Sequence, residues 1–258
     1  MISRMSVDGG RQHCPRFENY RVVVTGGARG IGASIVRAFA NEGADTAIVD
    51  LLIGEARLLA DELGGNAIEC DLSDPADTVK GMEAAISVLG GVDVLVNNAG
   101  VFKITPLLDI SAEEWDWVFS INTRAMLLTT QVAARAMIDQ GTGGKIVNTA
   151  SMGGKVGAAN QAHYAASKAA VISLTQVSAA ELGVHGINVN SICPGYVLTE
   201  MGAATRTDAI VAEWSAMSPL GRLADPADIA SMALFLASDD ADYCTGQAMN
   251  VTGGMISH

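Results

Sequence analysis

A tyrosine and a lysine four residues apart are the side chains of this sequence best suited to moving a proton. Tyr164 and Lys168 fall on one face of a predicted helix, close enough to interact. A tyrosine works as an acid or base near neutral pH only if its pKa, about 10 in water, falls by a few units. The Lys168 ammonium would favour the phenolate, and a shift of about 3 units corresponds to about 4 kcal/mol. Because such pairs also occur on helices by chance, the surrounding elements decide the interpretation.

The segments just before this pair strengthen the chemical interpretation. Residues 144–150 form a predicted strand that leads directly into Ser151. A glycine-rich loop, 152–162, then connects Ser151 to the helix that carries Tyr164. A hydroxyl, a phenol and an ammonium therefore follow the end of one strand.

An anion site is predicted near the start of the chain, where a strand passes into a helix through a glycine cluster. Val22–Val24 is an apolar β-branched run, and apolar residues recur at helical spacing over 31–39. Gly26, Gly30 and Gly32 lie between the two in the spacing Gly-x-x-x-Gly-x-Gly. Glycines let the backbone approach a pyrophosphate, and the helix N-terminus offers free N–H groups. The spacing differs from Gly-x-Gly-x-x-Gly and from a P-loop, and an ordinary tight turn is the alternative.

An acidic residue at the end of the next strand predicts which nicotinamide cofactor is bound. Asp50 ends the strand 46–50, about 20 residues beyond the glycine turn, where a carboxylate accepts hydrogen bonds from the adenosine ribose. A 2′-phosphate about 4 Å from Asp50 would be repelled by about 4 kcal/mol, roughly a thousandfold against NADP. Arg29 in the glycine turn acts in the opposite direction, but it can swing into solvent or pair with a carboxylate. NAD is therefore preferred, with a helix-capping role as the alternative for Asp50.

Strands and helices alternate along the rest of the chain, which predicts parallel pairing with right-handed crossovers. The fold class is α/β: a single doubly wound Rossmann domain, 20–258, with a parallel seven-stranded sheet flanked by helices. Residues 1–19 are predicted to be an N-terminal arm. The further strands are predicted at 67–71, 92–96, 144–150, 187–193 and near 248–251, and the further helices at 53–63, 75–90, 111–138, 164–182 and from 225.

Polar residues near the ends of these elements are further candidates. Asn97 and Asn98 follow a buried strand and could lock neighbouring strands, and Ala99 and Gly100 leave space beside a cofactor. Asn122 lies in the middle of the long helix 111–138, where asparagine is a poor helix former. It is either a solvent-facing polar residue or a local distortion that frees a carbonyl for water.

Composition excludes several function classes. The net charge of −12 and the pI of about 4.6 make nucleic acid an improbable partner, since phosphate backbones need a basic face. The four cysteines, Cys14, Cys70, Cys193 and Cys244, show no metal-type or Cys-x-x-Cys spacing, so no metal and no redox dithiol is expected. No signal peptide and no apolar run of membrane length is recognised. A soluble protein, cytoplasmic and without a membrane partner, is the expectation.

Taken together, these motifs resemble the short-chain dehydrogenase/reductase family in its classical form, over Tyr20 to about Gly254. They occur in the family's order: Thr25–Gly32, Asp71, Asn97–Gly100, Asn122, Ser151, Tyr164 with Lys168, and Pro194-Gly195 ahead of Thr199. The resemblance is specific for the family and not for the substrate. One departure is Thr252 in Val251–Gly254, where the family has an acid, and a structural role is expected there.

The resemblance implies a role for each candidate catalytic residue. Tyr164 would exchange a proton with the substrate oxygen, and Ser151 would donate a hydrogen bond to that oxygen. Lys168 would lower the pKa of Tyr164 and hold the nicotinamide ribose, and Asn122 would bind a water in a proton relay. With the glycine turn, the implied cofactor contacts are Gly26, Arg29, Gly30, Ile31, Gly32, Asp50, Asp71, Leu72, Asn98, Ala99, Gly100, Tyr164, Lys168, Pro194, Gly195, Val197 and Thr199.

The substrate is predicted less sharply than the reaction. Residues 144–151 and 170–176 resemble the sugar-alcohol dehydrogenases of the family, which implies NAD-dependent oxidation of a secondary alcohol, a polyol or a small diol. The alternatives are an NADPH-dependent 3-oxoacyl-thioester reductase, which Arg29 permits and Asp50 opposes, and a non-catalytic binding member of the family. The charged residues of the predicted substrate lid, about 198–220, are expected to form an ordinary solvated face; the alternative is that Arg206 or Lys155 holds a substrate carboxylate. The lid's other notable residues are Met201, Ala203, Ala204, Asp208, Ile210, Glu213, Trp214 and Met217.

An excess of apolar residues on two helices predicts self-association. The segment 115–132 and the helix 164–182 carry more apolar surface than a sheet should cover. In the family such helices form one interface and the last strand a second. Two different isologous interfaces give D₂ symmetry, so a homotetramer is expected.

Overall fold

Seven parallel strands form one sheet in the order β3-β2-β1-β4-β5-β6-β7. This computed structural model describes residues 15–200 and 207–258. The sheet order and the flanking helices confirm the predicted α/β, doubly wound class. The strands are β1 (Arg21–Thr25), β2 (Asp45–Asp50), β3 (Asn66–Glu69), β4 (Val94–Asn97), β5 (Gly144–Thr149), β6 (Ile187–Pro194) and β7 (Ala248–Val251).

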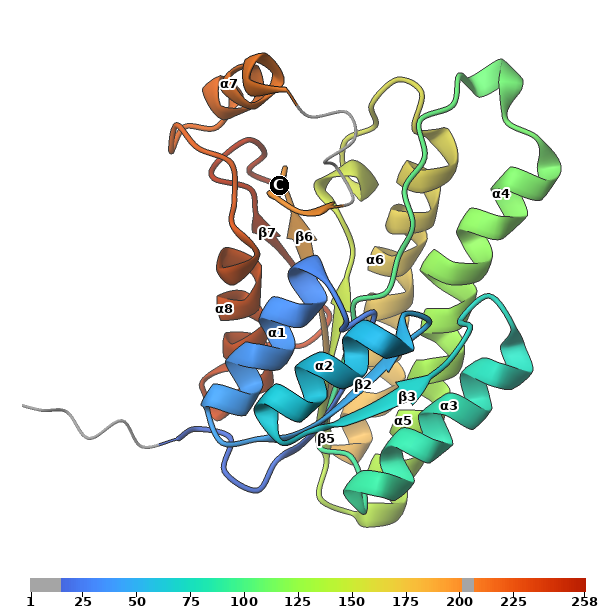
Figure 1. The fold of residues 1–258 in the computed structure, drawn as a ribbon, viewed down its shortest axis with the longest axis vertical. Coiled ribbons are helices and arrows are strands. Elements are labelled where there is room, and N and C mark those ends of the chain that lie inside the picture. Colours follow the sequence, from blue (N-terminus) through green and yellow to red (C-terminus); the bar gives the residue numbers. More distant parts are fainter. Residues whose placement is uncertain (1–14, 201–206) are drawn as a thin grey trace, which may run out of the picture.

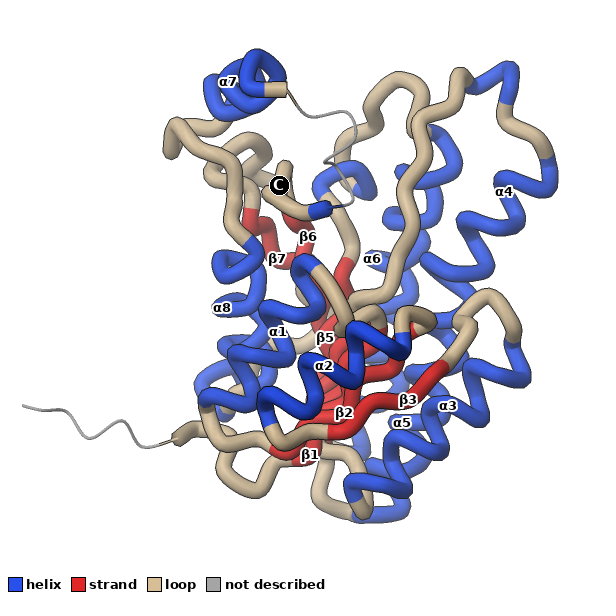
Figure 2. The backbone as a smooth tube through the Cα atoms, viewed as in Figure 1, coloured by secondary structure: helices blue, strands red, loops and turns tan. Residues whose placement is uncertain are grey.

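Helices cover both faces of this sheet. Buried side chains of α1, α2 and α8 share one apolar cluster, and those of α3, α5 and α6 share the other. Figures 1 and 2 show the two layers with the strands between them. The helices are α1 (Gly30–Asn41), α2 (Ile53–Leu63), α3 (Pro75–Leu89), α4 (Ala112–Phe119), α5 (Ala125–Gln140), α6 (Ala162–Leu182), α7 (Asp208–Met217) and α8 (Pro226–Ala237).

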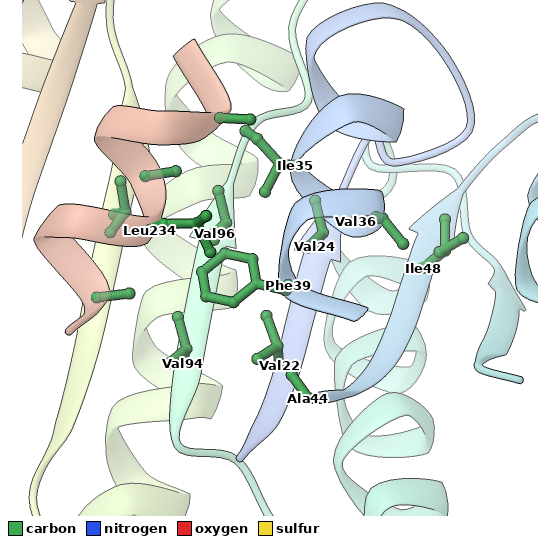
Figure 3. Packing of buried hydrophobic residues seen from close by; sticks show 14 of the residues in the cluster. Val22, Val24, Ile35, Val36, Phe39, Ala44, Ile48, Val94, Val96 and Leu234 are labelled. Carbon is green, nitrogen blue, oxygen red and sulfur yellow. The ribbon is translucent and has the colours of Figure 1, made fainter. Parts of the chain in front are cut away.

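The two faces of β1 each supply side chains to a different cluster, because successive strand residues point to opposite sides. Val22 and Val24 pack with Phe39 of α1 and Leu234 of α8, as Figure 3 shows, while Val23 belongs to the cluster on the other face. All three valines are fully buried. A strand buried on both faces is a continuous apolar run, which is why 22–24 could be identified from sequence.

The described end of the predicted N-terminal arm packs on the domain. The Phe17 ring is fully buried, with its centroid 4.9 Å from that of Phe39. The Arg16 guanidinium pairs with Glu42 at 2.9 Å. Residues 1–14 of the arm lie outside the described part of the chain.

The predicted helix 111–138 is divided in the structure. It consists of α4, a π-helical turn over Ser120–Arg124 and α5. Asn122 lies within the π-helical turn and is fully buried. The solvent-facing alternative for Asn122 is therefore wrong, and the predicted local distortion is confirmed.

The order of the strands places the site. The chain winds outward from β1 to β3 and returns to β4, so the direction of winding reverses between β1 and β4. In open α/β sheets ligands bind outside the carboxyl ends of the strands at such a switch point. The carboxyl ends of β1 and β4 lead into Gly26 and Asn98, two of the residues predicted to contact a cofactor.

Candidate active site

Gly26 and Gly32 of the turn after β1 are packed too closely for a side chain at either position. A Cβ on Gly32 would lie 2.0 Å from the Gly26 carbonyl oxygen, and one on Gly26 would lie 2.7 Å from the Ala99 Cα. Gly26 and Gly30 have φ of +62° and +53°, in the left-handed region that favours glycine. At these glycines the turn therefore presents bare backbone to the switch point.

The N-terminus of α1 differs from those of two other helices in how its first N–H groups are used. Asp74 and Ser111 accept hydrogen bonds from the first turns of α3 and α4. Arg29 stands at the same position of α1 and makes no capping hydrogen bond through its side chain within the described part of the chain. Backbone donors of α1 thus remain for an anion, which fits a pyrophosphate group.

Asp50 lies at the end of β2, directly beside the glycine turn. Its Oδ2 accepts a hydrogen bond from Ala28 N at 2.9 Å, and its Oδ1 accepts one from Leu52 N at 2.9 Å. The second bond shapes the turn before α2, whose N-cap is Leu52 and which no side chain of the described residues caps, so Asp50 does not cap this helix. The first ties the carboxylate to the glycine turn, where a ribose hydroxyl can be bound.

Arg29 is paired with a carboxylate of the next helix in this structure. Its guanidinium makes a two-pronged ion pair with the carboxylate of Glu55, in the first turn of α2. This partner holds the pKa of Glu55 below its usual value through a hydrogen bond. Sequence reasoning foresaw a carboxylate partner for Arg29 without identifying Glu55.

Asn98 and Thr25 join the two strands of the switch point. Asn98 Nδ2 donates to Gly26 O at 2.9 Å, and Thr25 Oγ1 accepts from the backbone N–H groups of Asn98 and Ala99. The predicted strand lock by Asn97 is also present, because its Nδ2 donates to Asn148 Oδ1 of β5 at 2.9 Å. These bonds fix the backbone that would face a cofactor.

Asp71 and Leu72 lie just beyond β3, which ends two residues earlier than predicted. The Asp71 carboxylate accepts a hydrogen bond from Ser73 N at 2.8 Å, and hydrogen bonds to Ser73 hold its pKa below the usual value. Leu72 is buried. The half-buried Asp71 therefore shapes the turn before α3.

Ser151, Tyr164 and Lys168 come together at the end of β5. Ser151 is buried, and its Oγ accepts from Gly153 N at 3.0 Å. Lys168 Nζ lies 5.9 Å from the centre of the Tyr164 ring and donates to Thr149 O at 2.7 Å. Gly100 reaches the same point, since a Cβ on it would lie 3.3 Å from both Lys168 Nζ and Asn122 Oδ1.

Burial acts against the effect that Lys168 is expected to have on the pKa of Tyr164. Burial raises the pKa of Tyr164, and a hydrogen bond with Ser151 only partly opposes this. Burial also lowers the pKa of Lys168 to about 8. Burial therefore disfavours the charged form of each group, and the lowering of the Tyr164 pKa by Lys168 stays a prediction.

The perturbed lysine has a consequence for stability. The unfolded chain holds the Lys168 proton up to a pKa near 10.4, whereas the folded chain releases it near 8. Between these two pKa values the unfolded state binds more protons than the folded state, so the free energy of unfolding rises with pH. Below pH 8 both states hold the proton, and the folded state bears the full cost of burying the ammonium. We expect Lys168→Met to abolish this rise.

Urea unfolding at pH 7.5 and 9.5 measures this contribution. The free energy of unfolding of the wild type, relative to Lys168→Met, should increase by roughly 2 kcal/mol over this range. Lys80→Met, on α3, is a control for loss of a surface charge. An equal pH response in wild type and Lys168→Met would show that Lys168 has an ordinary pKa.

Asn122 uses its side chain to hold the segment after Gly100. Its Oδ1 accepts from Val101 N at 2.7 Å, and its Nδ2 donates to Val101 O and to Ser167 Oγ, each at 3.0 Å. In the π-helical turn the backbone hydrogen bond spans five residues instead of four, since Ala125 N donates to Ser120 O. Asn122 thus lies beside Lys168 with its amide fully engaged.

The turn after β6 lies against the glycine turn. A Cβ on Gly195 would lie 3.0 Å from the Thr252 Cα, and Gly30 faces the side chains of Thr199 and Glu200. Val197 pairs with Ala224 in a short bridge. Thr252, which replaces the expected acid, is buried and contributes packing to this turn. Pro194, Gly195, Val197 and Thr199 therefore lie at the same edge of the sheet as Asp50.

The described part of the lid includes α7, which lies at the carboxyl edge of the sheet (Figure 1). The Trp214 ring stacks on Tyr196 with centroids 4.3 Å apart. Met201, Ala203, Ala204 and Arg206 lie outside the described residues. Two of the three donors of the Lys155 ammonium are used within the domain, because its Nζ donates to Ala248 O at 2.7 Å and Asn250 Oδ1 at 2.8 Å.

Sequence reasoning missed an aromatic neighbour of Tyr164. The Phe102 ring meets the Tyr164 ring edge to face, with centroids 4.8 Å apart and planes at 83°. Phe102 stands two residues after Gly100, and its aromatic character was the signal that could have drawn attention to it. The wall beside Tyr164 therefore includes a residue outside the predicted set.

Other classes of site are not seen in the part of the chain that the structure covers. Over residues 15–200 and 207–258, no group of three or more metal-binding side chains occurs. Across the same residues, no helix is both long and apolar enough to cross a membrane. Cys70, Cys193 and Cys244 are free thiols.

Comparison with known proteins gives consistent matches. The family model described as Enoyl-(Acyl carrier protein) reductase matches residues 26–256. Galactitol 2-dehydrogenase of Agrobacterium fabrum is 40% identical over 253 residues, which cover 93% of this chain and 98% of that protein. The (3R)-3-hydroxyacyl-CoA dehydrogenase of Homo sapiens is 37% identical over 256 residues, covering 93% and 97% of the two chains.

A solved structure with a similar fold extends these matches to three dimensions. A short-chain type dehydrogenase/reductase from Mycobacterium marinum is 36% identical and superposes with a TM-score of 0.89. The superposition covers 95% of this chain and 98% of that one.

Proposed function

The chain belongs to the short-chain dehydrogenase/reductase family and is an enzyme that acts on CH–OH groups with a nicotinamide cofactor; on that premise we propose that it transfers a hydride between NAD(H) and a secondary alcohol or ketone. The favoured substrate class is a sugar alcohol or small diol. The observation that carries the proposal is the meeting of Ser151, Tyr164 and Lys168 at the carboxyl end of β5, beside the glycine turn.

In the proposed reaction Tyr164 moves the proton. As a phenolate its Oη takes the hydroxyl proton of the alcohol while the carbon is oxidised, and as a phenol it gives a proton to the carbonyl oxygen in reduction. Ser151 Oγ donates a hydrogen bond to the same oxygen and stabilises its developing negative charge. The bound nicotinamide's contribution is to accept or return the hydride.

Lys168 and Asn122 support Tyr164. The pKa of Lys168, about 8, lies close to neutral pH. Lys168 can therefore pass a proton onward, or bind ribose hydroxyls as an ammonium. Asn122 holds Val101 through its side chain and lies in the π-helical turn, and its backbone carbonyl is the proposed site for a relay water. The protein's residues thus orient the substrate and carry the proton.

The contacts of Asp50 and Arg29 support NAD over NADP. The Asp50 carboxylate is bonded to the glycine turn, beside which the ribose is proposed to lie, and Arg29 is paired with Glu55. The residues proposed to hold the dinucleotide are those at the glycine turn, the switch point and the turn after β6: Gly26, Arg29, Gly30, Ile31, Gly32, Asp50, Asp71, Leu72, Asn98, Ala99, Gly100, Tyr164, Lys168, Pro194, Gly195, Val197 and Thr199.

The relatives support two substrate classes. The polyol class is favoured by the similarity to a galactitol 2-dehydrogenase. The second candidate is a 3-hydroxyacyl thioester or its oxo form, favoured by the similarity to the human (3R)-3-hydroxyacyl-CoA dehydrogenase. Both are secondary alcohols at the reacting carbon, so the site described above serves either.

A screen that varies cofactor and substrate separately tests the proposal. Purified protein is mixed with NAD or NADP and a panel of polyols, diols, hydroxy acids and 3-hydroxyacyl thioesters, and the absorbance of the reduced nicotinamide is followed. Turnover of a polyol or diol with NAD is the expected result. Turnover of thioesters alone selects the second candidate, and NAD binding without turnover of any substrate supports a non-catalytic role.

We also propose a homotetramer, from apolar residues left exposed on α5 and α6. Leu127 is 40% exposed and Val177 is 52% exposed, although Val171 of the same apolar group is fully buried in the domain. Exposed aliphatic side chains on neighbouring helices are typical of a face that packs on a second copy.

We expect the double variant Leu127→Glu and Val177→Glu to dissociate into smaller species. Two carboxylates per subunit would be buried in the interface without partners, at a cost of several kcal/mol each. Light scattering on a sizing column should give the mass of four chains for the wild type and less for the variant. Val184→Glu, at a side chain 83% exposed beyond the end of α6, is the control; a monomeric wild type contradicts the proposal.

A further inference from the structure

A second cluster of polar side chains lies beside Tyr164 and is built around Glu114 of α4. The Glu114 carboxylate accepts hydrogen bonds from Thr105 Oγ1 at 2.6 Å and from Lys103 Nζ at 3.2 Å. A third contact joins Glu114 Oε1 to His163 Nε2 at 2.9 Å. The segment just before α4 and the distant start of α6, 49 residues away, thus meet at one carboxylate whose side chain is only 19% exposed.

His163 directly precedes Tyr164 in α6, and its side chain is fully buried. Among the described residues, its Nδ1 has no hydrogen-bond partner. A buried Nδ1–H without an acceptor costs more than a bare lone pair, so the tautomer that fits is neutral with the proton on Nε2. The imidazole is therefore oriented by one hydrogen bond, the one it donates to Glu114.

The other two donors belong to the segment 101–106, which carries Phe102. Asn122 holds this segment at Val101 through two hydrogen bonds. At its other end Thr105 is held twice, by Glu114 through its hydroxyl and by Asn160 O through its N–H at 2.9 Å. Phe102 lies between the two anchors, with its ring against Tyr164.

We propose that Glu114 is a positioning residue for the reaction, acting on Tyr164 from two sides. Through His163 it fixes the first turn of α6, the turn that carries Tyr164. Through Thr105 it fixes the segment that presses Phe102 on the Tyr164 ring. The inference rests on the proposed role of Tyr164 in proton transfer, and it adds Glu114, His163 and Phe102 to the residues that determine substrate fit.

Kinetics of three variants test this role. Glu114→Leu keeps the volume and removes all three hydrogen bonds, whereas Glu114→Gln keeps an oxygen that His163 and Thr105 can still use. Since misplacing reacting groups by about 1 Å can cost about 100-fold, we expect Glu114→Leu to lower kcat/KM by about 10- to 100-fold, with a rise in KM. Glu114→Gln should keep most of the wild-type kcat/KM. Glu113→Leu, at the exposed neighbouring carboxylate, should match wild type.

A double-variant cycle separates positioning from a general loss of folded enzyme. If Glu114 acts through Phe102, then Glu114→Leu combined with Phe102→Leu should be little worse than the poorer single variant. NADH binding, measured by fluorescence titration, should keep its stoichiometry and Kd in every variant. Additive losses of kcat/KM in the double variant would overturn the proposal. A fall in kcat that parallels the fraction of protein able to bind NADH, with KM unchanged, would also overturn it.

A readout without substrate keeps this proposal distinct from the proposed function. Spectra of ¹⁵N-histidine-labelled protein, with His163 assigned by its loss in His163→Asn, should show a neutral Nε2–H imidazole that shifts in Glu114→Leu and not in Glu113→Leu. If the wild type turned over no alcohol while this result held, the proposed function would fail and the contact would stand. If turnover were normal in Glu114→Leu, the positioning role alone would fail.

Discussion

Tyr164→Phe is expected to lower kcat by about 1,000-fold while leaving NADH binding nearly unchanged. The substitution removes only the hydroxyl that exchanges a proton with the substrate, and such general acid–base groups contribute 10²- to 10⁴-fold. The phenylalanine ring can keep the edge-to-face contact with Phe102 and the cation–π contact with Lys168. Steady-state rates with saturating cofactor, beside a fluorescence titration of NADH, measure the two effects separately.

A second tyrosine offers a matched control for this experiment. Tyr243 is fully exposed, and Tyr243→Phe should retain full activity. Near-normal turnover in Tyr164→Phe would remove Tyr164 from the mechanism. Loss of NADH binding together with activity would instead indicate that the hydroxyl is needed to build the cofactor site.

Asp50→Asn is expected to reverse much of the discrimination against NADP. The carboxylate repels a 2′-phosphate by about 4 kcal/mol at 4 Å, so the ratio of kcat/KM for NAD to that for NADP should fall by up to roughly a thousandfold. Asparagine keeps an oxygen that can accept from Ala28 N, which preserves the shape of the glycine turn. The measurement is the pair of kcat/KM values for the two cofactors.

The ion pair between Arg29 and Glu55 predicts a further step in the same direction. Adding Glu55→Gln to Asp50→Asn frees the Arg29 guanidinium, which can then bind a 2′-phosphate. We expect the double variant to use NADP better than Asp50→Asn alone. Asp45→Asn, at the exposed start of β2, controls for removing a negative charge from the same strand; a cofactor ratio unmoved by Asp50→Asn would exclude Asp50 from the ribose site.

The elements of the fold were predictable because their signals are local. Val22–Val24 is buried on both faces and is apolar throughout, and Asp74 with Pro75 begins α3 while Gly90, at φ +72°, ends it. Alternation of such strands and helices restricts the topology to a parallel, doubly wound sheet. The candidate residues Asp50, Ser151, Tyr164 and Lys168 were found for the same reason, since each stands at a strand end or at helical spacing.

Contacts between distant segments had no such signal. Glu114 and His163 are separated by 49 residues, and Arg29 and Glu55 by 26; no spacing rule connects either pair. The pKa values followed the same pattern. The sequence placed Lys168 beside Tyr164, but burial, which raises the pKa of Tyr164 and lowers that of Lys168, depends on how β5, α6 and the segment 101–106 pack together.

By itself, then, the amino-acid sequence determined the order of elements, the class of fold and the residues able to move a proton and bind a dinucleotide. The tertiary structure decided which carboxylate holds Arg29, which side chains surround Tyr164 and that Lys155 is engaged by β7. The physical reason is that propensity and periodicity act over a few residues, whereas hydrogen-bond partners and burial are set by the sheet order that brings remote strand ends to one edge.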